Sequence, residues 1–132
     1  CIDGVEFIND SKGTNTDSSI KALEAYDHDV ILIAGGYDKK AEFGDFVKMF
    51  SGRVKHAIFM GATSQKLAEA CIENGYTRFS FAQSMKESVE LAKKLARPGD
   101  TVLLSPACAS WGMYNNFEQR GDDFKNNVRG NV

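Results

Sequence analysis

The sequence feature that most constrains the fold is an uninterrupted apolar run directly after Asp29. Residues 30–34 read Val-Ile-Leu-Ile-Ala, with no polar residue among them. A strand with one face in water alternates apolar and polar residues, whereas a strand covered on both faces of a parallel sheet is apolar throughout. The run therefore predicts a strand at 29–34 inside a parallel sheet, which needs helical crossovers to connect its strands.

The rest of the chain alternates strand-like and helix-like segments in the way that such a sheet requires. Strands are expected at about 5–8, 29–34, 54–60, 78–81 and 101–105, and helical patterns at about 16–26, 43–50, 67–72, 84–96 and from 116 onward. A chain of 132 residues fits one domain. We therefore predict an α/β fold, namely a three-layer sandwich with a mostly parallel, Rossmann-like sheet.

Helical spacing also predicts which side chains are buried. One stripe consists of Phe43, Phe46, Val47 and Phe50. A second consists of Leu67, Ala68, Cys71 and Ile72, in a helix that Gly75 should close. A buried cysteine on the second stripe is expected to be an inert thiol.

Polar residues of similar chemistry follow three of the expected strands. The loops at 9–15, 35–40 and 105–110 contain Asp10, Lys12, Thr14, Lys39 and Ser110. Each alone also fits a polar turn or a helix cap. Because the carboxyl ends of parallel strands lie along one edge of the sheet, the three loops are expected to converge on one ligand. The set is rich in cations and hydroxyl donors, which suit carboxylates or phosphates.

Composition excludes several classes of function. The formal charge of −2 gives no basic footprint for nucleic acid, and no apolar run reaches the roughly 20 residues of a membrane helix. Three scattered cysteines predict neither a disulfide framework nor a metal site, and a reducing cytoplasm fits them best.

Known phosphate-binding and catalytic motifs are also missing from the sequence. There is no G-x-x-x-x-G-K-[ST] loop and no G-x-G-x-x-G fingerprint, so the chain is not expected to cradle a triphosphate alone. His28 and His56 fit solvated or structural positions better than catalytic ones. The pattern favours a substrate clamp over a source of acid-base chemistry.

Three motifs together resemble the C-terminal domain of the Mur ligases, over nearly the whole chain. They are Asp10-Ser11-Lys12-Gly13-Thr14-Asn15, then Gly35-Gly36-x-x-Lys39, and finally Ser105-Pro106-Ala107-Cys108-Ala109-Ser110 with Asn116-Phe117-Glu118-Gln119-Arg120-Gly121. The nearest branch adds D-glutamate to UDP-N-acetylmuramoyl-L-alanine. Gly13 and the stretch 111–114 depart mildly from the pattern, and the second departure leaves the width of the amino-acid pocket open.

The resemblance implies that residues 1–132 are the third domain of a longer cytoplasmic enzyme of peptidoglycan precursor synthesis. ATP and Mg²⁺ would be bound mainly by a central domain, and the UDP sugar by an N-terminal domain. ATP would convert the acceptor carboxylate to an acyl phosphate, which D-glutamate then attacks. By the same resemblance Lys12 would be catalytic and face the phosphates, while Asp10 would face the ribose. The D-glutamate carboxylates would be held by Thr14, Lys39, Ser110 and the backbone at Phe117.

Two other classes remain open from the residues alone. A receiver-like signalling module would need an acidic cluster beside Asp10, which the sequence lacks. A stand-alone nucleotide-binding regulatory module would need a phosphate loop, and none is present. A longer protein with a G-K-[ST] loop upstream would favour the ligase.

Overall fold

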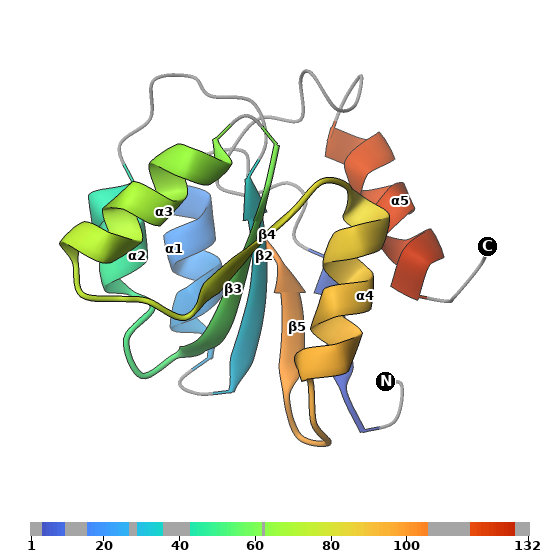
Figure 1. Ribbon diagram of the computed structural model, residues 1–132. Coiled ribbons are helices and arrows are strands. Elements are labelled where there is room, and N and C mark those ends of the chain that lie inside the picture. Colours follow the sequence, from blue (N-terminus) through green and yellow to red (C-terminus); the bar gives the residue numbers. More distant parts are fainter. Residues whose placement is uncertain are drawn as a thin grey trace.

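The computed structural model describes residues 4–9, 16–26, 29–35, 43–61, 63–105 and 117–128, with the backbone alone at 16–18 and 117. At the centre of this part of the chain lies a five-stranded sheet in the order β1-β5-β2-β3-β4, in which every neighbouring pair is parallel (Figure 1). The strands are β1 Glu6–Asn9, β2 Val30–Gly35, β3 Val54–Met60, β4 Phe79–Ala82 and β5 Thr101–Leu104. The predicted parallel sheet is confirmed.

Helices cover both faces of the sheet, which gives three layers (Figure 1). They are α1 Thr16–Glu24, α2 Gly44–Lys48, α3 Ser64–Glu73, α4 Met85–Leu95 and α5 Phe117–Val128. The first three pack on one face and the last two on the other. Right-handed crossovers explain this division, because the chain moves from β1 through β2 and β3 to β4 in one direction and then returns to β5.

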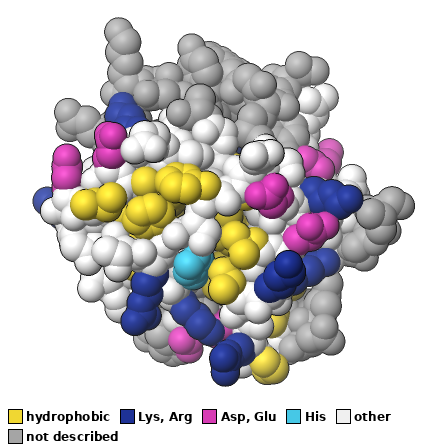
Figure 2. All heavy atoms as spheres, viewed as in Figure 1, with side chains coloured by type: hydrophobic (Ala, Val, Ile, Leu, Met, Phe, Trp, Pro, Cys, Tyr) yellow, Lys and Arg dark blue, Asp and Glu magenta, His cyan; other side chains and the backbone are white. Residues whose placement is uncertain are grey.

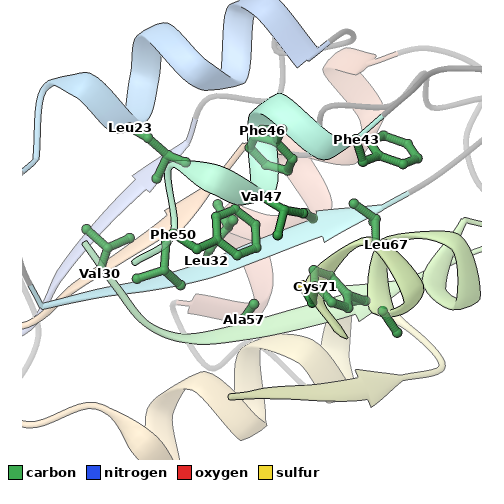
Figure 3. Close-up of a cluster of buried hydrophobic side chains, with 14 of the residues drawn as sticks. Leu23, Val30, Leu32, Phe43, Phe46, Val47, Phe50, Ala57, Leu67 and Cys71 are labelled. Carbon is green, nitrogen blue, oxygen red and sulfur yellow. The ribbon is translucent and has the colours of Figure 1, made fainter. Parts of the chain in front are cut away.

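The apolar run that opens β2 lies at the centre of the fold. All of β2 is buried, with Val30 and Leu32 in one core cluster and Ile31 and Ile33 in the other. Figure 3 shows the first cluster, where side chains from α1, α2 and α3 meet the sheet. The run is apolar throughout because each face of β2 supports a separate core.

The stripe on α2 is buried as predicted, although the helix is shorter than the pattern. Phe43, Phe46, Val47 and Phe50 are at most 3% exposed, and the rings of Phe46 and Phe50 pack edge to face with centroids 5.0 Å apart. Phe43 and Phe50 flank the five-residue helix instead of lying in it. Their burial in one core, more than helix propensity, fixes this segment.

One core prediction is wrong. Leu67, Ala68 and Cys71 on α3 are buried, but Ile72 is 62% exposed. A residue one position beyond Cys71 is rotated by roughly 100° around the helix, which turns Ile72 away from the sheet. Gly75, at φ +76, closes this helix as expected.

At the start of α4 the Ser84 Oγ accepts a hydrogen bond from the Glu87 backbone N at 3.1 Å, which is one half of a capping box. Despite Gly121, α5 continues unbroken from residue 117 to residue 128.

Candidate active site

The three strands that precede the predicted site loops are neighbours in the sheet. β5 lies between β1 and β2, and Leu104 pairs with both Asn9 and Ile33. The carboxyl ends of these strands are therefore nearly level. The loops that follow Asn9, Gly35 and Ser105 leave from adjacent points of one edge, as the sequence pattern predicted.

The connections also change direction at this point. After β1 and β2 the chain continues to α1 and α2 on one face of the sheet, whereas after β5 it continues to α5 on the other face (Figure 1). Open α/β sheets bind ligands at the carboxyl edge, at the point where neighbouring strands connect to opposite faces. The topology thus identifies the exit of β5 and its two neighbours as the candidate site.

Most of the predicted site residues lie outside the described part of the chain. Asp10, Lys12, Thr14, Lys39 and Ser110 belong to the segments 10–15, 36–42 and 106–116. Phe117 is the first residue of α5, where its backbone is described and its side chain is not. The structure therefore defines the strand ends that position these residues, and their roles stay predictions.

A buried hydroxyl pair anchors the exit of β5. Ser105 follows the strand directly, and its backbone N donates to the Ile33 carbonyl oxygen at 3.1 Å. Its Oγ lies 2.9 Å from the Oγ of Ser19 on α1, and both residues are fully buried. Since an unpaired buried hydroxyl is costly, this bond ties α1 to the point where the third loop begins.

Gly35 fixes the exit of β2 for a steric reason. Its φ is +119, and a Cβ at this position would lie 1.9 Å from the Met60 carbonyl oxygen on β3. No other residue fits there without separating the two strands. The packing of β2 against β3 therefore requires glycine at the start of the Gly-Gly-x-x-Lys motif, whatever the motif binds.

Arg120 is a further buried polar residue near this edge. It lies in the first turn of α5 and is only 1% exposed. Sequence reasoning assigned it no role, although its spacing of four from the buried Phe124 places it on the inward stripe of the helix. That spacing is the sequence signal from which its burial could have been predicted.

A shallow hollow of about 300 Å³ adjoins the last residue of β1. It is lined by Phe7, Ile8, Asn9, Phe124, Lys125 and Val128. The lining is mostly apolar and one cation lies in it. The hollow therefore lies between β1, the edge strand, and α5.

His56 and Cys71, which lie away from this edge, have structural surroundings, as the sequence predicted. The His56 ring Nε2 lies 2.8 Å from the Ser80 Oγ on the neighbouring strand, and burial together with the Arg78 charge lowers the pKa of His56. Burial raises the pKa of the Cys71 thiol to about 12, so it stays protonated at neutral pH and is a poor nucleophile. His28 lies outside the described residues.

Within the described ranges, no group of three or more His, Cys, Asp or Glu residues is arranged to hold a metal ion. In the same part of the chain, no helix combines the length and the apolar character that crossing a bilayer requires.

Comparison with known proteins decides the family. The family described as "Mur ligase, glutamate ligase domain" matches residues 1–108. The chain belongs to the Mur ligase family. The matched region of this Mur ligase chain contains all three strand exits of the candidate site.

Curated relatives of this Mur ligase domain agree with that assignment. The UDP-N-acetylmuramoylalanine--D-glutamate ligase of Alkaliphilus metalliredigens is 55% identical over 124 residues, covering 94% of this chain and 27% of the relative. The protein of the same name from Caldicellulosiruptor saccharolyticus is 51% identical over 127 residues, covering 96% of this chain and 28% of the relative. The chain thus spans under a third of the length of these ligases.

A solved structure supports the fold. Mycobacterium tuberculosis folylpolyglutamate synthase, solved with ADP, superposes with a TM-score of 0.55 over 72% of this chain and 25% of its own, at 11% identity. The fold of this Mur ligase domain is therefore also found in a folylpolyglutamate synthase, at very low sequence identity.

Proposed function

We propose that this chain is the amino-acid-delivering domain of a UDP-N-acetylmuramoylalanine--D-glutamate ligase, acting in the cytoplasm on peptidoglycan precursors. The complete enzyme would use ATP to convert the carboxylate of UDP-N-acetylmuramoyl-L-alanine to an acyl phosphate. The amine of D-glutamate would then attack this carbonyl, forming the amide and releasing phosphate. About 50% identity to ligases of this name over nearly the whole chain supports the proposal.

The observation that carries the proposal is the adjacency of β1, β5 and β2 at one edge of the sheet. The three strand exits lead into the segments that contain Lys12, Lys39 and Ser110. These segments begin within the span of three neighbouring strands, which lie roughly 5 Å apart. One amino acid can therefore be held by groups from all three.

The chemistry of the proposed groups suits D-glutamate. Its two carboxylates need cations and hydroxyl donors, and its amine must stay unprotonated to attack. We assign Thr14, Lys39, Ser110 and the Phe117 backbone to the carboxylates. No carboxylate is among them, so the site would not stabilise the ammonium form.

The nucleotide is assigned to the first of the three loops. Lys12 would stabilise charge on the transferring phosphate, and Asp10 would accept hydrogen bonds from the ribose. ATP and Mg²⁺ would otherwise be bound by the other domains, which the chain would meet at its carboxyl edge. We therefore expect the isolated chain to hydrolyse no ATP.

Steady-state kinetics of a full-length ligase carrying this sequence would test the assignment. Lys39→Ala should cost on the order of 2–4 kcal/mol in the amino-acid step, seen as a steep rise in the KM for D-glutamate. Ser110→Ala removes one hydroxyl donor and should cost less, about 1–3 kcal/mol. Both variants should leave the KM for ATP nearly unchanged.

The exposed Lys93 provides a matched control, because it lies in the last turn of α4, which leads to the start of β5 and so to the opposite edge of the sheet. Its Nζ donates to the Asn127 carbonyl oxygen. Lys93→Ala should keep wild-type kinetics. If Lys39→Ala weakened ATP and D-glutamate equally, or weakened neither, the three loops would not form one amino-acid site.

A further inference from the structure

A second hollow lies at the opposite edge of the sheet, where β2, β3 and β4 begin. It has a volume of about 350 Å³ and is lined by Asp29, Gly52, Arg53, Val54, Lys55 and Arg78. We call it the basic hollow. Its three cations are concentrated on a chain whose formal charge is −2, so they do not reflect a basic surface in general.

The backbone around the basic hollow is held in place by the sheet. Val30 N donates to the Arg53 carbonyl oxygen at 3.0 Å, and Ala57 N donates to that of Arg78 at 2.9 Å. These bonds fix the two arginines on neighbouring strand entries. A ligand that binds here would not have to order the backbone, which lowers the entropic cost of binding.

The two arginines have hydrogen-bonding capacity to spare. The Arg53 Nη1 lies 3.5 Å from the Met49 carbonyl oxygen, at the limit of a hydrogen bond, and its Nε is buried with no partner among the described residues. A guanidinium has five N–H donors, so Arg53 keeps donors beyond this one weak bond with which to bind a ligand. Arg78 is exposed and close enough to His56 for its charge to lower the pKa of that ring.

Two carboxylates limit the positive charge. Lys55 Nζ pairs with Asp100 Oδ2 at 2.6 Å, which largely neutralises that lysine. Asp29 lines the hollow itself. The two arginines therefore supply most of the attraction, against the opposing charge of Asp29. Figure 2 shows Lys and Arg side chains next to the histidine coloured on this face.

We propose that the basic hollow binds a phosphate group, held by the guanidinium groups of Arg53 and Arg78. The planar fork of arginine matches the oxygens of phosphate, which can accept two parallel hydrogen bonds from each guanidinium. The site is at the amino ends of the strands, whereas the candidate active site is at their carboxyl ends. It does not depend on the function proposed above.

Amide chemical-shift titration of the ¹⁵N-labelled chain at pH 7 and constant ionic strength tests the proposal. Inorganic phosphate and glycerol 3-phosphate would be added in separate experiments, to distinguish the free ion from a phosphate monoester. We expect saturable shifts at Gly52, Arg53 and Arg78 with at least one of them. Tighter binding of the monoester would identify the ligand as an organic phosphate, and equal binding would identify the phosphate group alone.

Substitutions test which side chains favour phosphate binding and which oppose it. Arg78→Gln should weaken binding by about tenfold, and Arg53→Gln likewise, because each removes a charged donor pair. Asp29→Asn should tighten it by about twofold or more, since it removes a repelling charge. Asn also tolerates the positive φ of 58 found at this residue.

Arg97→Gln is the matched control, because this exposed arginine precedes β5 and does not line the hollow. It should change binding by less than about twofold. Absence of saturable shifts with either phosphate, or equal weakening by Arg97→Gln and Arg78→Gln, would overturn the proposal. Arg78 is exposed, so its variant is expected to fold even if Arg53→Gln does not.

Discussion

Replacing Gly35 by alanine tests the steric account of the β2 exit. The added Cβ would lie 1.9 Å from the Met60 carbonyl oxygen and 2.9 Å from the Met60 backbone N. An ordinary carbon–oxygen contact is about 3.3 Å or more, so β2 and β3 would have to separate by roughly 1.4 Å at this pair. The obstacle is the backbone of β3, an interior strand paired on both sides, and backbone cannot rotate aside as a side chain can.

Two costs add up in this variant. A side chain in a sparsely populated backbone region costs about 1–3 kcal/mol. Overpacking against fixed atoms costs about 1–3 kcal/mol more. We therefore expect Gly35→Ala to lower the free energy of unfolding by about 2–6 kcal/mol, a large part of the roughly 5–15 kcal/mol typical of a domain.

Urea denaturation followed by circular dichroism measures this loss, and two other glycines separate its causes. Gly75 has φ +76, but an added Cβ would meet no atom within 4 Å, so Gly75→Ala should show the backbone cost alone, about 1–2 kcal/mol. Gly44→Ala, with neither a positive φ nor a close neighbour, should change stability by less than about 1 kcal/mol. A Gly35→Ala loss no larger than that of Gly75→Ala would refute the steric argument.

Two further predictions concern buried polar contacts. Ser105→Ala should lower the free energy of unfolding, measured in urea, by about 1–3 kcal/mol, because it leaves the buried Ser19 hydroxyl unpaired. The Ser19→Ala/Ser105→Ala double variant should lose less than the sum of the two single variants, and strict additivity would mean that the two hydroxyls are not coupled. Asp100→Asn should cost about 1.5–3 kcal/mol at pH 7, because Asp100 accepts hydrogen bonds from Lys55 Nζ and the Arg97 backbone N. Burial alone would raise the pKa of Asp100, but these two bonds and the charges of Lys55 and Arg97 outweigh it and hold the pKa below its ordinary value. Folding therefore stabilises the charged form of Asp100. Its contribution to the free energy of unfolding is complete above about pH 5 and is lost as the pH falls below about 4. The stability difference between wild type and Asp100→Asn, measured from pH 7 to pH 3, should shrink only at the acidic end; a constant difference would contradict the ion pair.

The sequence by itself determined the local elements. The apolar run at 30–34 predicted a strand buried on both faces, and all six residues of β2 are buried. Spacing predicted the buried Phe43–Phe50 stripe, and the helical pattern expected from about residue 84 coincides with α4, which Ser84 caps. These features follow from the period of a helix or strand and from caps that act within a few residues, so the chain alone specifies them.

The sequence also indicated which strand exits carry chemistry, but it did not show that the three strands are neighbours. The order β1-β5-β2-β3-β4 depends on pairing between Leu103 and both Ile8 and Leu32, residues far apart in the chain. Any strand order would give the same apolar runs. Only the folded sheet decides which strand ends are neighbours, because strand order depends on the packing of all the strands and helices together.

Tertiary structure alone decided the remaining features. Ile72 looks as apolar as Cys71 in the sequence, yet the orientation of α3 exposes it. Ser19 and Ser105 are 86 residues apart and carry no local sign of their contact. The basic hollow likewise joins Arg53 and Arg78 from separate strand entries. Such contacts form only when distant segments pack, so local periodicity and capping cannot encode them.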